Sequence, residues 1–461
     1  MKERNYLLID IGTSSIKAAV MSGAGEVFSS VRRRLVDRGS VPGSMRVGRW
    51  EEELRQSIPH LVSGYRVDAV VLSGNGPTLV AIDGAGEPME PVMLWLDDRR
   101  RGIGETESFY LPRMRWFLDR PEASRVRQFI PFPEYLAYRL TGEAVAISPS
   151  HAFERYIWSE PERERYGVPP EMLPPFVPVG SAIGGVRSDQ AERYGLTAGT
   201  PVVAAGSDFL MSLVGTNTLQ PGRCCDRAGT SEGINFCSDR SIRSEGLRTL
   251  PHIREGYFNV AGILASTGLL FEWFREISGQ AGRDYGDMMV DILEVSDGTR
   301  IPWFFPSEHR GAAWEFQRGM FIGLGAEHNR AMMGRAVVLS IGFAVREAIE
   351  YLGHSGCTVE ELRACGGQAR NGLWTQMKSD ICGIPIAVPH VADAELTGNL
   401  AVGMRALGEA GSLEEAADRV VRFIHHYEPD SRRSSVYDEQ YRQYQERYGR
   451  FRTALRECQS E

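Results

Sequence analysis

The residue types and spacings that best suggest chemistry lie in two similar turns. Gly12–Ser14 follows Asp10, and Gly229–Ser231 follows Asp226, each with the order Gly-Thr-Ser. Glycine lets backbone N–H groups come close to an anion, and the two hydroxyls add hydrogen-bond donors, so such a turn can hold a phosphate. An ordinary hairpin turn is the alternative for either copy alone. The recurrence in matching contexts favours a shared chemical role.

A lysine and an aspartate accompany the first turn. Lys17 lies just after it, and the only other lysines of the chain are Lys2 and Lys378. Asp10 is suited to hold Mg²⁺ through water, because Mg²⁺ prefers oxygen ligands, and Lys17 would bring positive charge close to the phosphates. No Gly-Lys dipeptide occurs, so the GxxxxGK[ST] phosphate loop is absent. A nucleotide would have to be held by the Gly-Thr-Ser turns instead.

A carboxylate and a double-glycine loop are further candidates. Asp208 ends the apolar run over 201–207, where its carboxylate would project from a strand end as a general base requires. A helix N-cap or turn aspartate is the alternative. Gly366 and Gly367 precede a predicted helix over 373–382 and would admit a nucleotide closely, with a plain loop as the alternative.

Two motifs of other enzyme classes fail on their context. Residues 229–233 fit GxSxG, the nucleophile elbow of α/β-hydrolases, and residues 14–17 fit the SxxK of penicillin-recognising enzymes. The elbow requires a helix after Ser231, but Ile234–Cys237 continues as a strand. SxxK requires a helix and partner motifs such as KTG, which the chain lacks. A hydrolase acting through Ser231 is therefore only a third hypothesis.

The elements that position these residues follow from short apolar runs and turns in the first third of the chain. Runs joined by tight turns predict an antiparallel meander, and later crossovers predict a mixed sheet in an α/β domain. The region 91–178 is rich in Pro, Arg and aromatic residues and is interpreted as an elaboration of that domain. We expect strands over 5–11, 16–21, 27–35, 67–72 and 78–82, and helices over 51–60 and 134–140.

The last third is the most helical part. An apolar stretch over 336–352 predicts a buried helix. Ser412 and Glu415 form a capping-box pattern for a helix that is predicted to run to His425. Aromatic residues at spacings of four and three over 437–455 predict the packing face of a C-terminal helix.

Length and composition limit the possibilities further. The 461 residues suffice for two or three domains, and the repeated turn together with the break near 220–222 predicts two, 1–219 and 220–461. A formal net charge of −8 with scattered arginines argues against nucleic acid or membrane as a partner. Seven cysteines without a CxxC pair or metal-ligand spacing are typical of buried thiols in a reducing compartment, and no signal segment is apparent, so we expect a cytoplasmic protein.

Taken in order, these segments resemble the FGGY family of carbohydrate kinases along nearly the whole chain. Each segment alone is weak, but their order is specific. The matching segments are LLIDIGTSSIKAAV (7–20), VVLSGNGPTLVAID (70–83), MLWLDDRR (93–100), EYLAYRLTGE (134–143), AAGSDF (204–209), DRAGTSEG (226–233), RGMFIGL (318–324), GGQARNGLWTQMKSDICGIPI (366–386) and ELTGNLAVGMRALG (395–408).

The resemblance implies two actin-like, ribonuclease-H-like α/β domains with mixed β-sheets around a central cleft. It also implies ATP-dependent phosphorylation of a hydroxyl on a small sugar, ketose or polyol, with the sugar on the N-terminal side and the nucleotide on the C-terminal side. In this scheme Asp208 accepts the hydroxyl proton and Asp10 helps to position Mg²⁺. The residues implied in holding ATP are Gly12, Thr13, Ser14, Lys17, Gly229, Thr230, Ser231, Gly366, Gly367 and Asn371.

The chain departs from the family pattern where the substrate is chosen. Gly76-Pro77 replaces the Met-His of members acting on xylulose and the Arg-Glu of those acting on glycerol, and Phe209 replaces the usual Asn or Gln. The usual Gly-Glu-Arg segment of the second domain also differs, at 307–310. We therefore expect a less polar pocket than a ketose site. Candidate substrate contacts are Gly76, Pro77, Trp95, Asp97, Tyr110 and Phe209, with packing or loop bridging as the alternative for Trp95, Asp97 and Tyr110.

Two hypotheses from different classes remain. The first is a carbohydrate kinase that uses ATP and Mg²⁺, which the presence of Asp10, Lys17 and Asp208 favours. The second is a catalytically inactive sugar or nucleotide sensor on the same fold. A small sugar or polyol is the expected partner, and a homodimer is left open as the assembly.

Overall fold

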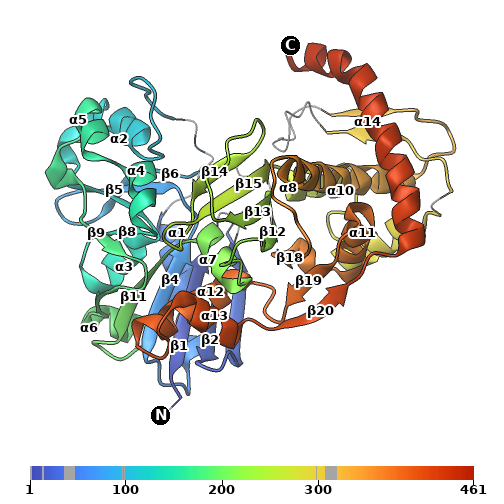
Figure 1. The fold of residues 1–461 in the computed structure, drawn as a ribbon. Helices are drawn as coiled ribbons and strands as arrows, with labels where there is room; N and C mark the ends of the chain where they lie inside the picture. Colours follow the sequence, from blue (N-terminus) through green and yellow to red (C-terminus); the bar gives the residue numbers. More distant parts are fainter. Residues whose placement is uncertain are drawn as a thin grey trace. The chain divides into compact units, whose positions relative to one another are not determined.

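The computed structural model describes residues 3–12, 15–35, 47–95, 97, 99–296, 298–306 and 319–460, with side chains up to residue 451. Contacts divide the chain into two compact units (Figure 1). Unit 1 comprises Met1–Asn217, Pro251–Gly256 and Asp393–Val421, and unit 2 comprises Thr218–Leu250, Tyr257–Ala392 and Arg422–Glu461.

A six-stranded sheet with the strand order β10-β11-β4-β1-β2-β3 forms the centre of unit 1. Its β1, β2 and β3 are the predicted antiparallel meander, whereas β4 and β11 run parallel to β1, so the sheet is mixed as expected. Side chains alternate between the two faces of a strand. Leu7 and Ile9 pack in one cluster with Trp50 of α1 (Val47–Val62). The strands are β1 (Asn5–Ile11), β2 (Ser15–Ser22), β3 (Val27–Arg34), β4 (Ala69–Gly74), β10 (Ala182–Gly185) and β11 (Pro201–Ser207).

The region between β4 and β10 elaborates unit 1, as its composition predicted. It contains a three-stranded sheet of order β6-β5-β7 and a two-stranded sheet of β8 and β9. Its strands are β5 (Thr78–Ile82), β6 (Pro88–Met93), β7 (Gln128–Phe132), β8 (Ala146–Ser148) and β9 (Phe176–Pro178). The helices of this part and of the strand ends are α2 (Leu111–Leu118), α3 (Glu134–Thr141), α4 (Glu154–Ile157), α5 (Glu160–Arg165), α6 (Ser188–Tyr194) and α7 (Asp208–Gly215), with short 3₁₀ turns η1 (Pro121–Arg125), η2 (His151–Phe153) and η3 (Pro170–Met172).

Unit 1 also takes up a late segment of the chain, which two continuous domains 1–219 and 220–461 would not include. The segment forms α12 (Ala394–Ala406) and α13 (Leu413–Val420). A Cβ at Gly403 of α12 would lie 2.9 Å from the side chains of Tyr6 and Val71, so a glycine permits this close approach of helix and sheet. Packing on β1 and β4 therefore assigns α12 to unit 1, and no local pattern in the sequence encodes that return.

Unit 2 is built on a seven-stranded sheet of order β14-β15-β13-β12-β18-β19-β20. Here β12 and β13 form a hairpin with β18 parallel to β12, just as β1 and β2 form a hairpin with β4 parallel to β1. The repeated turn motif thus marks a repeated structural arrangement. The strands are β12 (Cys224–Ala228), β13 (Glu232–Ser238), β14 (Arg248–Pro251), β15 (Phe258–Leu264), β18 (Leu362–Cys365), β19 (Ile386–Pro389) and β20 (Phe423–Tyr427), while β16 (Trp303–Phe305) pairs with β17 (Met320–Ile322).

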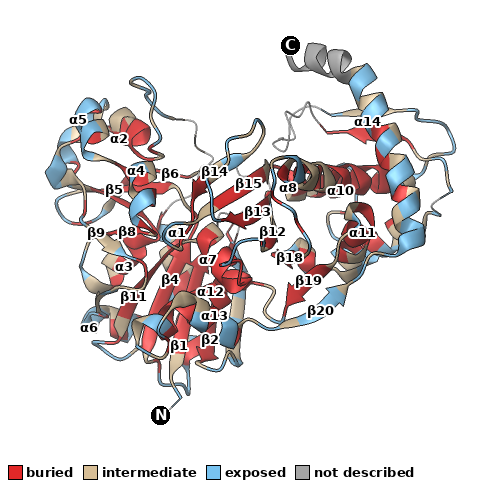
Figure 2. Ribbon diagram, viewed as in Figure 1, coloured by how far each residue is buried: buried red, intermediate tan, exposed pale blue. Residues whose placement is uncertain are grey.

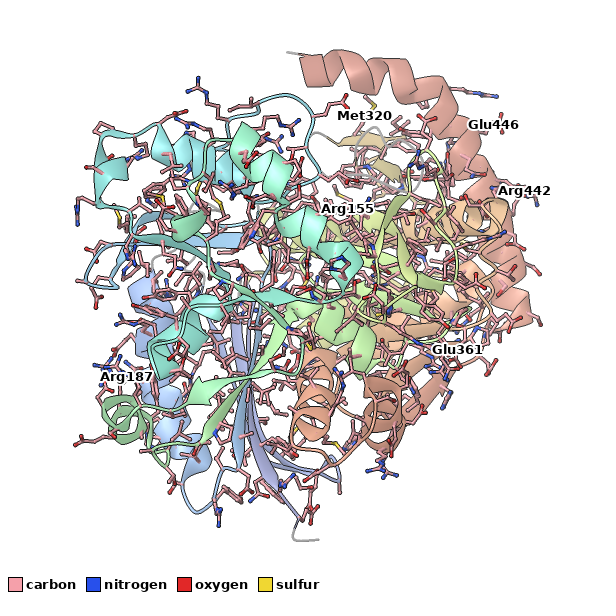
Figure 3. The ribbon with its side chains drawn as sticks, turned by 60° about the vertical axis from the view of Figure 1, so that its left-hand side comes forward. Arg155, Arg187, Met320, Glu361, Arg442 and Glu446 are labelled. Atoms are coloured by element: carbon pink, nitrogen blue, oxygen red, sulfur yellow. The ribbon has the colours of Figure 1, made fainter. Side chains whose placement is uncertain are left out.

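The helices of unit 2 confirm two predictions. The apolar stretch forms the buried centre of α10 (Arg330–His354). On α14 (Ser431–Ser460), Tyr441 and Tyr444 pack against Phe343, so the aromatic residues form a packing face, whereas Arg442 and Glu446 are exposed (Figure 3). Buried residues concentrate in the sheets and in α10 (Figure 2). The remaining helices are α8 (Thr267–Ile277), α9 (Tyr285–Glu294) and α11 (Gly372–Cys382), with the 3₁₀ turn η4 (Gln368–Arg370).

One predicted helix was too long. The Ser412 hydroxyl accepts a hydrogen bond from the Glu415 N–H at 3.1 Å, as the capping pattern indicates. The helix α13 nevertheless ends at Val420 rather than at His425, because the following residues pair with β19 as the edge strand β20. Tertiary pairing here overrides the local helical pattern.

Two further observations concern the whole described chain. None of the six cysteines whose side chains are described forms a disulfide, and five of these side chains are buried. None of the helices in the described part combines the length and apolarity that a membrane crossing requires.

Candidate active site

The hairpin of β1 and β2 contains a buried ionic cluster. Asp10 lies opposite Lys17 in the strand register. Lys17 Nζ lies 3.2 Å from Asp10 Oδ2 and 3.1 Å from Glu395 Oε2 of α12. Ser73 of β4 donates a hydrogen bond from its hydroxyl to Asp10 Oδ1 at 2.8 Å. The Lys17 ammonium is therefore already bound by two carboxylates.

Burial and neighbouring charges shift the pKa values in this cluster. Burial raises the pKa of Asp10 to about 6, Lys17 lowers it, and the charges of Glu395 and Asp208 raise it. Burial lowers the pKa of Lys17, but Glu395 and Asp10 outweigh that effect and raise the pKa above its ordinary value. Lys17 stays protonated at neutral pH, and the carboxylates around it outnumber it.

Asp208 belongs to the same electrostatic neighbourhood. It is the first residue of α7, directly after β11, and is 8% exposed. β11 runs parallel to β4 with Ser207 opposite Gly74, so both strands end at the same edge of the sheet. Because the charge of Asp208 raises the pKa of Asp10, the two carboxylates interact through the protein interior. The structure thus brings the predicted base and the predicted metal-binding carboxylate together in unit 1.

The first Gly-Thr-Ser turn is described only in part. The Gly12 N–H donates to the Ser15 carbonyl at 3.0 Å, which closes the turn. Thr13 and Ser14 lie outside the described residues, and so does the segment 307–310.

Three of the predicted acceptor contacts lie close to the chain that leads into α7. A Cβ at Gly76 would lie 3.2 Å from the Cβ of Ser207 and 4.0 Å from Tyr110 Oη, so the backbone at 76 approaches both. Phe209 follows Asp208 in α7 and is half-buried.

Two arginines order the other predicted acceptor contacts. The buried Arg113 donates to the carbonyl oxygens of Pro77 at 2.7 Å and of Trp95 at 3.0 Å, so it ties these two segments together. The Asp97 carboxylate accepts hydrogen bonds from Arg99 Nε at 2.8 Å and from the Arg99 N–H at 2.9 Å. Asp97 therefore orders its own loop. Arg113 carries no sequence signal, because it is one of many arginines in that region.

The hairpin of β12 and β13 contains a second buried ionic cluster. Lys378 of α11 lies 3.1 Å from Asp226 Oδ2 and also bonds to Glu232 Oε1. Among the described residues no hydrogen-bond partner reaches Asp226 Oδ1 or Glu232 Oε2, although both atoms are buried. Burial and the charge of Glu232 raise the pKa of Asp226 to about 8, and Lys378 acts in the opposite direction. The rarity of lysine in this chain is the one signal that could have pointed to Lys378.

The second Gly-Thr-Ser turn is enclosed by two other segments of unit 2. The Leu269 N–H of α8 donates to the Thr230 carbonyl at 3.2 Å. Gln368 Nε2 lies 3.4 Å from the Gly229 carbonyl oxygen and 3.2 Å from the Thr267 hydroxyl. The loop that follows β18 and the start of α8 thus meet at this turn. The sequence offered a partial signal, since Gln368 lies within the double-glycine motif.

Glycines lie where other backbone segments pack closely against the strand β12 and the turn that follows it. A Cβ at Gly268 would lie 2.2 Å from the Gly229 carbonyl oxygen, and one at Gly366 would lie 2.5 Å from the Ala228 carbonyl oxygen. Gly366 also has a φ of 91°, which other residues rarely adopt. By contrast, Gly367 has open space around it. Asn371 accepts a hydrogen bond from the Trp374 N–H at 3.1 Å through Oδ1 and thereby caps α11.

The residues fit the two groups that a phosphoryl transfer would require. In unit 1, Asp10, Glu395 and Asp208 outnumber the charge of Lys17, so a divalent cation would offset surplus negative charge. Grouped ligands are not preformed, because the described residues include no set of three His, Cys, Asp or Glu side chains that could hold a metal. In unit 2, close backbone packing at Gly268 and Gly366 holds the turn Gly229–Ser231 in place, and backbone N–H groups of such a turn suit the recognition of a phosphate.

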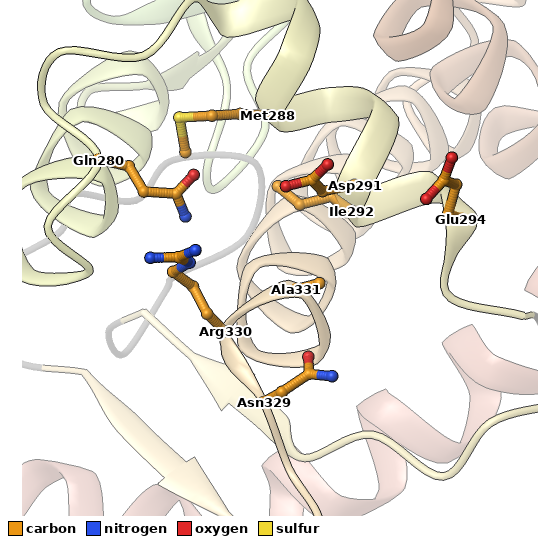
Figure 4. Close-up of a pocket in the computed structure, with 8 residues that line it drawn as sticks. All are labelled: Gln280, Met288, Asp291, Ile292, Glu294, Asn329, Arg330 and Ala331. Carbon is orange, nitrogen blue, oxygen red and sulfur yellow. The ribbon is translucent and has the colours of Figure 1, made fainter.

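A separate pocket of about 300 Å³ lies in unit 2 between the end of α9 and the start of α10 (Figure 4). Its polar residues serve the local fold: Asp291 is bound by Arg283 at 2.5 Å, Asn329 caps α10, and Arg330 donates to the Ser278 carbonyl at 3.3 Å. None of the residues that the sequence singled out lines this pocket.

Relatives with assigned names match along almost the full length. The chain is 24% identical to a xylulose kinase of Staphylococcus epidermidis over 97% of both chains, and 25% identical to an autoinducer-2 kinase of Klebsiella pneumoniae over 96% of this chain and 94% of that one. The fold matches the crystal structure of a ligand-bound xylulose kinase from Lactobacillus acidophilus with a TM-score of 0.82 at 18% identity, over 99% of this chain and 100% of the other. This likeness confirms the predicted two-domain, actin-like α/β fold class.

Family sequence profiles cover both halves of the chain. The profile of the N-terminal domain of the FGGY carbohydrate kinases matches residues 5–215, and that of the C-terminal domain matches residues 227–407. With both domains matched in order, and with relatives named as kinases over the full length, the resemblance first noted in the motifs is confirmed. The chain belongs to the FGGY family of carbohydrate kinases.

Proposed function

We propose that this protein transfers the γ-phosphoryl group of ATP to a hydroxyl of a small sugar, ketose or polyol, with Asp208 as the general base. FGGY kinases are ATP-dependent, so ATP is the co-substrate that family membership implies. The observation that carries the proposal is the interaction of two buried carboxylates, Asp208 and Asp10, at one edge of the unit 1 sheet.

Asp208 is suited to accept the proton of the attacking hydroxyl. Its carboxylate begins α7 at the end of β11, with little exposure to water. Phosphoryl transfer depends on positioning and charge stabilisation more than on covalent chemistry, so a correctly placed base and a held phosphate suffice. A general base typically contributes about 10² to 10⁴-fold to the rate.

Asp10 is the residue that would hold Mg²⁺, with Asp208 as its neighbour. When bound, the ion neutralises charge on the phosphate groups. Ser73 orients Asp10 Oδ1 by a 2.8 Å hydrogen bond, and Lys17 keeps Oδ2 in place. In this proposal Lys17 acts on the phosphates through Asp10, because its ammonium is bound to two carboxylates.

In unit 2, the turn Gly229–Ser231 would bind phosphate oxygens through the backbone N–H groups and hydroxyls of Thr230 and Ser231, because the Gly229 N–H already donates to the Ser231 carbonyl. Gly366 and Gly367 would let the nucleotide approach the backbone, and Asn371 would border the adenosine. In unit 1, Gly12, Thr13 and Ser14 would have the corresponding role. We accordingly assign the acceptor to unit 1 and the nucleotide to unit 2.

The proposal is tested with purified protein and a panel of ketoses, aldoses and polyols. We expect Mg²⁺-dependent ADP formation with at least one member, reduced at least about 10²-fold in Asp208→Asn, as expected for a lost general base. Asp189→Asn is the matched control, because this aspartate of α6 is exposed and lies in the same unit. It should keep full activity.

An inert panel would contradict the kinase proposal. If a sugar still raises the melting temperature of that inert protein, the sensor hypothesis is favoured. Equal turnover by Asp208→Asn and the wild type would remove Asp208 from the role of base.

A further inference from the structure

The polar side chains near the end of β4 are already bound within the protein. Asn75 Nδ2 donates to the Ile11 carbonyl at 3.2 Å, and Asn75 Oδ1 accepts from the Thr78 hydroxyl. Both side chains are buried. Arg113 donates to the backbone carbonyls of Pro77, Trp95 and Asp97, and the Asp97 carboxylate accepts from Arg99. These groups therefore have little hydrogen-bonding capacity left for the hydroxyls of a substrate.

The surface that remains beside Asp208 is largely apolar. Position 76 lacks a side chain, and a Cβ there would come within 3.2 Å of Ser207. Pro77 has no N–H. Phe209 directly follows the proposed base, and its ring centre lies 6.5 Å from that of Phe153.

An aromatic row continues from Phe209 through unit 1. The ring centres of Phe153 and Tyr156 are 5.7 Å apart, and those of Tyr156 and Phe109 are 5.8 Å apart. Next to Phe109, the Tyr110 hydroxyl forms no hydrogen bond with the residues that the structure describes, and it lies 4.0 Å from the Cβ position at Gly76. Burial, followed by the charge of Glu134, raises the pKa of Tyr110, so this hydroxyl remains a neutral hydrogen-bond partner. It offers one polar contact at the edge of an apolar surface.

We infer that the acceptor is a deoxy sugar or a methyl-bearing polyol, in which a carbon without oxygen packs against Phe209 and Pro77 while Tyr110 binds one hydroxyl. The inference rests on the proposed kinase function and specifies its substrate class. Phe209 is the specificity-determining residue. A fully hydroxylated acceptor would leave a hydroxyl against this apolar surface without a partner, which costs binding free energy.

The expected discrimination is moderate. One methyl or methylene group in an apolar pocket is worth about 10 to 200-fold in kcat/KM, and apolar pockets reject an added hydroxyl by about 100-fold. We therefore expect kcat/KM for a deoxy acceptor to exceed that of its hydroxylated partner by about 10 to 100-fold.

The experiment measures ADP formation with pairs that differ by one oxygen. Suitable pairs are L-rhamnulose and L-fructose, L-fuculose and L-tagatose, 1-deoxy-D-xylulose and D-xylulose, and 1,2-propanediol and glycerol. The wild type should prefer the deoxy member in the pair that it uses best. In Phe209→Asn this ratio should fall at least about 10-fold, because the amide provides a partner for the additional hydroxyl.

Two further variants separate specificity from folding. Phe209→Leu keeps an apolar side chain and should retain the preference for the deoxy member. Phe28→Asn alters another half-buried ring of unit 1, which stacks on Tyr65 at 5.3 Å, and should leave the ratio unchanged.

Preference of the wild type for the hydroxylated members, or an unchanged ratio in Phe209→Asn, would overturn the inference while the kinase function stands. No ADP formation with any acceptor would instead contradict the kinase function. In that case the increase in melting temperature caused by each member of a pair is compared. A larger increase with the deoxy member supports the inferred acceptor class, and an equal or smaller increase overturns it.

Discussion

The two Gly-Thr-Ser hairpins use the same three charges from different elements. Each has an aspartate on its first strand and a lysine that links this aspartate to a glutamate. In unit 1 the lysine, Lys17, is on the second strand, and the glutamate comes from α12. In unit 2 the glutamate, Glu232, is on the second strand, and Lys378 comes from α11. In both hairpins a lysine ammonium lies between two carboxyl groups, although different elements supply the lysine.

The two clusters differ in how many of their buried carboxyl oxygens have a hydrogen-bond donor. Asp10 Oδ1 has the Ser73 hydroxyl as a donor, whereas no described residue donates to the buried Asp226 Oδ1. Burial raises the pKa of Asp10 to about 6 and, together with the charge of Glu232, that of Asp226 to about 8. Near pH 7 the first aspartate is mainly ionised and the second mainly protonated. One hairpin is thus suited to cation chemistry, whereas in the other the raised pKa of Asp226 favours its protonated form.

Removing the lysine from either cluster should lower the free energy of unfolding more than any other change in the two clusters. The loss should be larger for Lys378 in unit 2 than for Lys17 in unit 1. Lys378→Met leaves the buried carboxyl groups of Asp226 and Glu232 without a positive charge beside them, and breaking a buried ion pair costs about 3 to 5 kcal/mol in the free energy of unfolding. Lys17→Met should cost less, because Asp10 keeps its hydrogen bond from Ser73. Urea unfolding of both variants measures the difference.

Arg55→Met is the control for that measurement, because Arg55 is an exposed partner of Glu52 and its replacement should change the free energy of unfolding little. A smaller loss for Lys378→Met than for Lys17→Met would contradict the view that the second cluster is the less well satisfied one.

Replacing the aspartate of each hairpin by asparagine should lower kcat to different extents in the two hairpins. At pH 7.5, Asp10→Asn removes a charge that is present, and we expect kcat to fall about 10 to 100-fold, as for loss of a group that supports a metal site. Asp226→Asn replaces a carboxyl group that is already mainly protonated by a neutral amide. The charge at this position therefore changes little, and kcat should stay within about threefold. ADP formation under saturating ATP and acceptor gives both values. Similar losses in the two variants would show that the hairpins do not differ in this way.

The pH dependence of stability should reveal the proton in unit 2. Because the folded-state pKa of Asp226 is near 8, above its ordinary value of 3.8, the folded protein retains a proton that the unfolded chain releases. Stability from this group is therefore present at low pH and is lost as pH rises towards about 8, whereas the contribution of Asp10 is lost by about pH 6. The slope is up to about 1.4 kcal/mol per pH unit for one proton.

Between pH 6 and 8 this slope should be smaller in Asp226→Asn than in the wild type, as measured by urea unfolding at several pH values. Asp10→Asn should change the slope only near pH 6, at the lower end of that interval, where the Asp10 carboxyl still titrates. A wild-type slope retained in Asp226→Asn would place the titrating group elsewhere.

The sequence predicted the hairpins more fully than their charges. Alternating apolar residues and tight turns identify β1, β2, β12 and β13, because strand formation and turns are encoded locally. The partners of the aspartates are not. Lys378 lies 152 residues from Asp226, so only the packing of α11 brings them together.

Contacts between distant segments also explain the other features that the sequence did not predict. Glu395 lies within a motif that was recognised, but its pairing with Lys17 depends on the return of α12 to unit 1. The strand β20 was predicted as the end of a helix, because pairing with β19 is not visible in the local pattern. In the sequence, Arg113 cannot be distinguished from the neighbouring arginines. Its hydrogen bonds to backbone carbonyls form only in the folded chain.

Glycine substitutions should give the smallest effects and test the surroundings of the two turns. Gly366→Ala places a Cβ 2.5 Å from the Ala228 carbonyl oxygen at a φ of 91°, whereas Gly12→Ala places one at 3.3 Å from the Ser15 carbonyl oxygen, with no such φ. Strain of this kind costs about 1 to 3 kcal/mol, so we expect the KM for ATP to rise about 10-fold in Gly366→Ala, and less in Gly12→Ala.

Gly353→Ala of α10 is the control for Gly366→Ala, because it lies in the same unit, has open space around it and should leave the KM for ATP unchanged. The acceptor provides the sharper comparison. If unit 2 holds the nucleotide, Gly366→Ala should raise the KM for ATP while the KM for the acceptor stays within about twofold, because uniform binding of one substrate is lost without the other. An equal rise in both would mean that the loop after β18 supports the whole active site, and the two hairpins would then share one task rather than divide it.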